Sequence, residues 1–116
     1  MEIYLSVVQG FYYFVTGIWP LLSIDTFMQV TGPKTDTWLV KTVGVLVTVI
    51  GAALINAGLW VDFSPEVLII AIGSALGLML IDIIYVLKKV ISKIYLLDAA
   101  AELVLVTGWL LALIIF

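Results

Sequence analysis

The sequence contains no cysteine and no histidine, and none of its five basic residues is an arginine. The lack of cysteine excludes disulfides, thiol relays and thiolate nucleophiles. The lack of histidine removes the usual haem ligand and the usual general base near neutral pH. Without arginine, the side chain that binds phosphate and carboxylate groups in a bidentate manner is missing too. We therefore expect no cofactor, no metal site and no nucleic-acid partner.

Charged residues are also scarce, whereas apolar residues are abundant. Of the 116 residues, 65% are hydrophobic and 11% are charged, and the mean hydropathy is +1.31. A soluble domain has about half apolar residues, so this chain is too apolar to hide its surface from water by folding alone. The composition predicts an all-α integral membrane protein with the lipid bilayer as its first partner.

Four apolar runs occupy nearly the whole chain, each about as long as the 20 residues that cross a bilayer. They cover residues 3–24, 38–60, 66–87 and 94–116. We expect a single transmembrane domain over residues 1–116, folded as a four-helix up-and-down transmembrane bundle. The first run lacks a basic segment before it and is longer than the apolar core of a typical signal peptide, so it is expected to be a retained span.

The connections between these runs carry turn and capping residues. Residues 25–37 form the longest connection and end in TGPKTDT, where Asp36 or Thr37 is expected to cap the second helix. Ser64 precedes Pro65, and proline suits the first turn of a helix because no N–H is needed there. Ser64 is therefore the expected cap of the third helix.

The lysines predict the orientation of the chain. Lys34 and Lys41 flank the first connection, and the remaining three lysines fill the third, at positions 88, 89 and 93. The charged residues at the second connection are both acidic, Asp62 and Glu66. By the positive-inside rule, connections 25–37 and 88–93 are expected to be cytoplasmic and both termini non-cytoplasmic.

Polar side chains recur along one face of the first run. Gln9, Tyr13, Thr16 and Ser23 follow one another at helical spacing, and Tyr12 lies beside them. This polar stripe is expected to face protein or water. The alternative is an ordinary helix, kinked at Pro20, whose hydroxyl groups bond to their own backbone.

Glycines mark two expected packing faces. Gly44, Gly51 and Gly58 recur every seven residues in the second run, and Gly73 and Gly77 form a G-x-x-x-G pair in the third. Small residues at such spacing allow close contact between helices in lipid. We expect both sets to serve helix packing. The partner in such packing can be a helix of the same chain, a second copy of the chain or another membrane subunit.

Three carboxyl groups lie inside or at the edge of the apolar runs, at Asp82, Asp98 and Glu102. Asp98 and Glu102 are four residues apart, so they share a helix face, and Glu102 lies roughly 12 Å beyond the third connection. Lys41 is expected at similar depth. The two aspartates either pair with lysines at the headgroup boundary or belong to a binding site, and Glu102 needs a partner, water or a function.

Three classes of function remain open. The first is binding or transport of a cation, a proton or an amine-bearing small solute at a site formed by Glu102, Asp98, Asp82 and Lys41. The second is an accessory or scaffolding subunit of a larger membrane complex, in which the charged cluster only fixes assembly. An intramembrane enzyme ranks last, because it would have to work with carboxyl groups alone.

Overall fold

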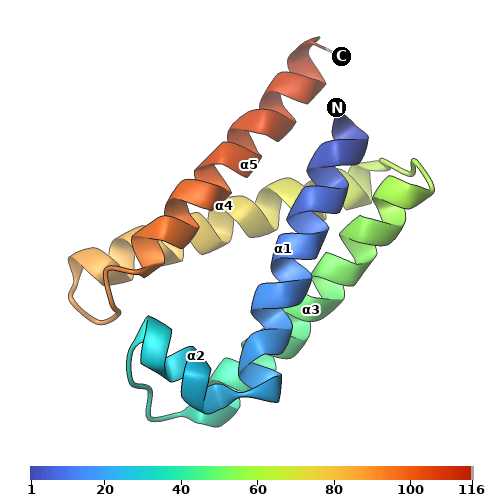
Figure 1. Ribbon diagram of the computed structural model, residues 1–116. Helices are drawn as coiled ribbons and strands as arrows, with labels where there is room; N and C mark the ends of the chain where they lie inside the picture. The colour runs from blue at the N-terminus through green and yellow to red at the C-terminus, as the bar shows by residue number, and fades with distance from the viewer. Residues whose placement is uncertain (116) are drawn as a thin grey trace.

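Five α-helices make up the chain in the computed structural model, which describes residues 1–115 (Figure 1). Four are long and one is short: α1 (Glu2–Leu22), α2 (Ile24–Thr31), α3 (Thr37–Leu59), α4 (Pro65–Leu87) and α5 (Tyr95–Ile115). The four long helices contain 21 to 23 residues each and are apolar enough to cross a membrane. The prediction of an all-helical chain with four candidate spans is thus confirmed.

The long helices begin and end within two residues of the expected runs, and Phe116, the last residue of the fourth expected span, lies outside the described residues. The start of α1 and the end of α5 lie at the same end of the molecule, opposite the α4–α5 turn and α2 (Figure 1). Insertion in a bilayer, the orientation of the termini and the up-and-down bundle stay predictions.

The short helix α2 was not expected, because residues 25–37 were interpreted as a connection without structure of its own. Ser23 ends α1 and caps α2, and its hydroxyl oxygen accepts hydrogen bonds from the backbone N–H of Thr26 at 3.5 Å and from the Thr26 hydroxyl at 2.9 Å. Gly32 then ends α2 with a φ of 100°, which glycine adopts without strain. Because α1 ends at Leu22, Ser23 is not part of the polar stripe on that helix.

The expected caps of α3 and α4 can be compared directly with the structure. The Ser64 hydroxyl accepts a hydrogen bond from the backbone N–H of Val67 at 3.4 Å, and Pro65 is the first residue of α4, as predicted. Asp36 occupies the N-cap position of α3, although its side chain makes no capping hydrogen bond. Local sequence signals therefore located both helix starts.

Helices α1 and α3 pack so closely that their backbones touch. A Cβ atom built on Gly51 would lie 2.6 Å from the carbonyl oxygen of Gly10, and one built on Gly17 would lie 2.8 Å from that of Gly44. Such approach requires glycine on both helices, because an ordinary van der Waals contact begins near 3.4 Å. The seven-residue glycine repeat of α3 thus faces glycines of α1 spaced by the same interval.

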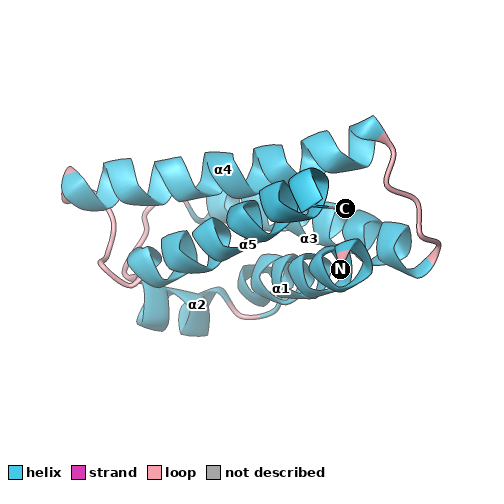
Figure 2. Cartoon of the chain, turned by 90° about the horizontal axis from the view of Figure 1, so that it is seen from above, coloured by secondary structure: helices cyan, strands magenta, loops and turns pink. Residues whose placement is uncertain are grey.

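The second pair of neighbouring helices is α4 and α5, which cross beside the first pair (Figure 2). A small core joins the two pairs, formed by Tyr13, Leu54, Ala71, Ala75, Leu105, Val106 and Trp109. Its residues come from all four long helices, and Trp109 is fully buried. Much of the remaining surface is apolar, including isoleucines of α4 and α5 that are up to 80% exposed, as suits a surface covered by lipid.

Candidate functional site

Gln9 of α1 lies at the centre of the contact between the helix pairs. Its side-chain nitrogen donates a hydrogen bond to the carbonyl oxygen of Ala71 in α4 at 2.8 Å. Its side-chain oxygen accepts one from the indole N–H of Trp109 in α5 at 2.7 Å. The amide is fully buried, so both of its polar ends need such partners. Gln9 therefore ties α1 to α4 and α5 at once.

One helical turn further along α1, Tyr13 holds the deepest carboxyl group. Its hydroxyl donates a hydrogen bond to Oε2 of Glu102 at 2.6 Å, and both residues are at most 1% exposed. The other carboxyl oxygen, Oε1, has no hydrogen-bond partner among the described residues. A buried oxygen of this kind is costly unless a proton, a water molecule or a ligand donor reaches it.

A second tyrosine binds a second carboxyl group in the same way. The Tyr12 hydroxyl donates a short hydrogen bond to Oδ1 of Asp98, which is only partly buried. Asp82 of α4 is 5% exposed and lies within reach of Asp98, and its Oδ2 has no hydrogen-bond partner in the described chain. The three carboxyl groups predicted from the sequence thus form one cluster, anchored by two adjacent tyrosines of α1.

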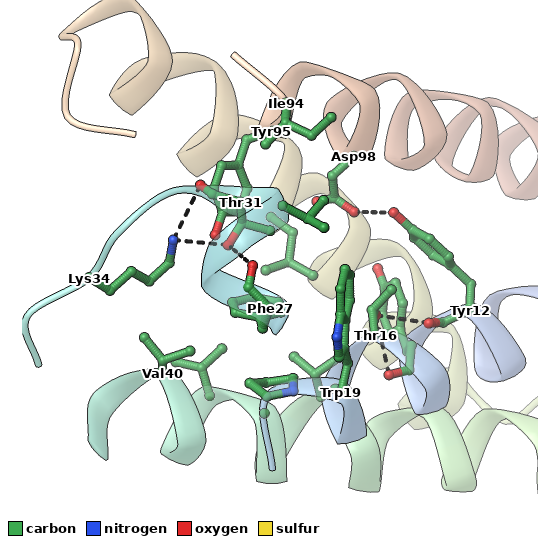
Figure 3. Close-up of a pocket in the computed structure, with 18 of the residues that line it drawn as sticks. Tyr12, Thr16, Trp19, Phe27, Thr31, Lys34, Val40, Ile94, Tyr95 and Asp98 are labelled. Atoms are coloured by element: carbon green, nitrogen blue, oxygen red, sulfur yellow. Dashed lines mark hydrogen bonds between the residues drawn. The ribbon is translucent and has the colours of Figure 1, made fainter. Parts of the chain in front are cut away.

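A cavity of about 580 Å³ opens beside this cluster and is lined by residues of all five helices (Figure 3). Asp98 and Glu102 line it from α5, and Thr16 lines it from α1. Five aromatic residues contribute to its wall: Tyr12, Tyr13, Trp19, Phe27 and Tyr95. The size is within the range of about 300 to 1,000 Å³ that is typical of small-molecule sites.

Lys34, which follows α2, is the basic residue at this cavity. Its ammonium group lies over the rings of Phe27 and Tyr95, 5.6 and 5.1 Å from their centres. It donates hydrogen bonds to the hydroxyl of Thr31 at 3.2 Å and to the carbonyl oxygens of Thr31 and Gly32 at 3.4 and 3.2 Å. Lys34 therefore links the C-terminal end of α2 to Tyr95 at the start of α5.

Thr16 and Lys41 do not take the roles that the sequence suggested. The Thr16 hydroxyl donates to the carbonyl oxygen of Tyr12 at 2.8 Å, which is the self-bonded arrangement left open above, although Thr16 also lines the cavity. Lys41 is exposed near the start of α3 and is absent from the cavity wall. A long side chain near a helix end keeps its charge at the surface, so Lys41 is not part of the acidic cluster.

The packing role expected of Gly73 and Gly77 is not seen within this chain. A Cβ atom built on either glycine would meet no described atom within 4 Å, whereas one built on Gly58 of α3 would lie 2.7 Å from the side chain of Val7 in α1. The reason is the rotation of α4, which turns Ala71 and Ala75 inward. A position two residues further on points about 200° away on a helix, so the two glycines face outward.

Several residues that shape the site were missed by the sequence analysis. Tyr12 was noted only as a neighbour of the polar stripe, Lys34 was used only to predict the orientation, and Trp109 was given no role. Gly10 and Gly17 repeat at the seven-residue interval of the α3 glycines, and this match was the available signal for pairing α1 with α3.

The carboxyl cluster does not have the geometry of a metal centre. Among residues 1–115, no group of three or more acidic, histidine or cysteine side chains is arranged to hold a metal ion. The carboxyl groups can accept hydrogen bonds from a neutral donor or from the cationic group of a ligand. The aromatic side chains of the cavity wall can also attract a cation. Comparisons of the chain with protein-family models, curated protein sequences and solved structures found no significant match.

Proposed function

We propose that this chain is a small multi-pass membrane protein that binds a cation or an amine-bearing small solute in the cavity beside Asp98 and Glu102. The observation that carries the proposal is the carboxyl group of Glu102. It is fully buried, it lines the cavity, and one of its oxygens has no partner in the described chain. Ionisable groups inside membrane segments are expensive and generally have a function.

The partners of the carboxyl groups also favour a binding site over simple charge pairing. Tyr12 and Tyr13 donate to Asp98 and Glu102, and a tyrosine hydroxyl orients a carboxylate without neutralising it. An ion pair with a lysine would instead have neutralised the carboxylate and occupied its oxygens. The two hydroxyl groups therefore fix the direction of the carboxyl groups, which favours a site for a ligand that donates hydrogen bonds.

The proposal can be tested by thermal unfolding of the purified protein in detergent with a panel of cations. The panel contains sodium, potassium, magnesium, ammonium and several primary amines at constant ionic strength. A ligand at 100 times its dissociation constant adds about 2.7 kcal/mol to the stability of the folded state. We expect at least one cation to raise the unfolding temperature of the wild type but not that of Glu102→Gln.

Glu66→Gln is the matched control, because Glu66 is exposed in the first turn of α4 and is remote from the cavity wall. It should respond to the panel as the wild type does. A panel in which no cation gives a stabilisation that depends on Glu102 would contradict the proposed function. Flux of the stabilising cation into liposomes then distinguishes transport from binding alone.

A second candidate function is that of an accessory subunit, and the outward face of α4 favours it. Gly73 and Gly77 leave room for another helix to approach there, since an added Cβ would meet nothing. Purification under mild detergent separates the two candidates. A solitary stable protein favours the binding site, and obligate co-purification with other membrane subunits favours the accessory role.

A further inference from the structure

The two ends of the cavity differ in chemistry. At one end lie two carboxyl groups: Glu102 lines the wall, with Oε2 bonded to Tyr13 and a buried Oε1 that has no partner in the described chain, and the partly buried Asp98 lies one helical turn away, held by Tyr12. This end offers acceptors whose orientation is already fixed. A ligand group placed here has to donate hydrogen bonds and gains most if it carries a positive charge.

The rest of the wall is apolar or aromatic. Beyond the carboxyl groups the cavity is lined by residues such as Trp19, Phe27, Val43 and Val47. Aromatic faces attract cations and also accommodate hydrocarbon, whereas they offer no ligands to a hydrated metal ion. The wall therefore suits a ligand with a sizeable apolar body attached to its charged head.

Lys34 bears on whether that ligand also carries a negative charge. Its ammonium group already makes three hydrogen bonds, to Thr31 and Gly32, and lies over two aromatic rings. An ammonium group has three N–H donors, and these acceptors can occupy all three, so a carboxylate or phosphate on the ligand would have to displace one of them. This arrangement favours a ligand with one positive charge over a zwitterion such as an amino acid.

From these observations we infer that the cavity binds a lipophilic amine, with its ammonium group donating to Glu102 and its apolar body against Trp19 and Phe27. The inference rests on the proposed function and narrows its ligand class. The mostly apolar and aromatic wall offers an inorganic cation few oxygen ligands, and a bare proton would not need a cavity of about 580 Å³. A lipid tail alone would leave Oε1 of Glu102 without a donor.

The test compares ligands of one shape that differ in charge. The probes are 1-naphthylmethylamine and 1-naphthalenemethanol, an ammonium and its neutral analogue, together with sodium and potassium ions. Binding to the full chain in nanodiscs is measured by equilibrium dialysis, with empty nanodiscs subtracted. We expect saturable binding of the amine, and binding of the alcohol that is at least about tenfold weaker, since a hydrogen bond to a charged group accounts for one to two orders of magnitude in affinity.

Variants then locate the site. Glu102→Gln should weaken amine binding about tenfold or more and leave binding of the alcohol unchanged, whereas Glu66→Gln should alter neither. If Glu102→Gln does not fold, Asp98→Asn replaces it, because an amide oxygen can still accept the hydrogen bond from Tyr12. Helical content by circular dichroism shows that each variant is folded.

Each alternative result has a separate meaning. Equal binding of amine and alcohol would overturn the inference and identify an apolar groove for lipid. Binding of sodium or potassium without the amine would overturn the ligand class while leaving the proposed cation site intact. Binding of none of the probes, together with no stabilisation by the wider cation panel, would defeat both the inference and the proposed function.

Discussion

Replacing Gly51 by alanine tests the contact on which the α1–α3 pair depends. The new Cβ would lie 2.5 Å from the backbone nitrogen of Phe14 and 2.6 Å from the carbonyl oxygen of Gly10. Ordinary contacts begin near 3.4 Å, so the helices have to separate by 3.4 minus 2.5, or 0.9 Å, at this point. The obstructing atoms are backbone, so no side-chain rotation relieves the overlap.

The cost follows from two opposing effects. Overpacking of this kind destabilises by about 1 to 3 kcal/mol. Alanine also gains up to about 1 kcal/mol over glycine in helix propensity. Gly77→Ala has the same propensity gain without the overlap, because nothing lies within 4 Å of its added Cβ. We therefore expect Gly51→Ala to be less stable than Gly77→Ala by about 1 to 3 kcal/mol.

The measurement is reversible unfolding in mixed detergent micelles, followed by circular dichroism, for the wild type and both variants. Equal stability of Gly51→Ala and Gly77→Ala would refute the close backbone contact between α1 and α3. Sedimentation of both variants in the same detergent checks that Gly77→Ala has not changed an assembly instead.

The remaining predictions concern the carboxyl cluster and the topology. Tyr13→Phe removes the donor to Oε2 of Glu102, so that neither carboxyl oxygen has a partner, and should lower the free energy of unfolding in detergent by about 1 to 3 kcal/mol. Tyr4→Phe is the control at an exposed position and should have no effect. Lys41→Gln should leave cation binding unchanged, because Lys41 is exposed and lies outside the cavity wall; a loss of binding would return it to the site. Reporter tags at either terminus should give non-cytoplasmic signals, and a cytoplasmic signal would overturn the predicted orientation.

The sequence predicted the helices better than their arrangement. Apolar runs of sufficient length located the four long helices, and Ser64 with Pro65 located the start of α4, because these signals are local. The helix α2 was missed because it has only eight residues and follows α1 after a single residue, Ser23, inside a connection interpreted from its turn residues. Pairing of α1 with α3 depends on residues far apart in the chain, which periodicity on one helix does not specify.

The site was predicted in part for the same reason. The sequence identified Asp82, Asp98 and Glu102 because charge inside an apolar run is conspicuous, and the structure brings all three together. It did not identify their partners, because the hydrogen bond from Tyr13 to Glu102 spans 89 residues. Lys41 was included on helix depth alone, and depth does not determine the direction in which a flexible side chain points.

The hydrogen bonds that α1 makes to the other helix pair have a mechanical consequence. They begin at Gln9, Tyr12 and Tyr13, which lie within about 6 Å of helix rise. On α5 their partners run from Asp98 to Trp109, which is eleven residues or about 16 Å of helix rise. Because the bonds are spread along α5, a rotation of α4 and α5 against α1 would break at least one of them, so these bonds hold the two helix pairs at a fixed angle.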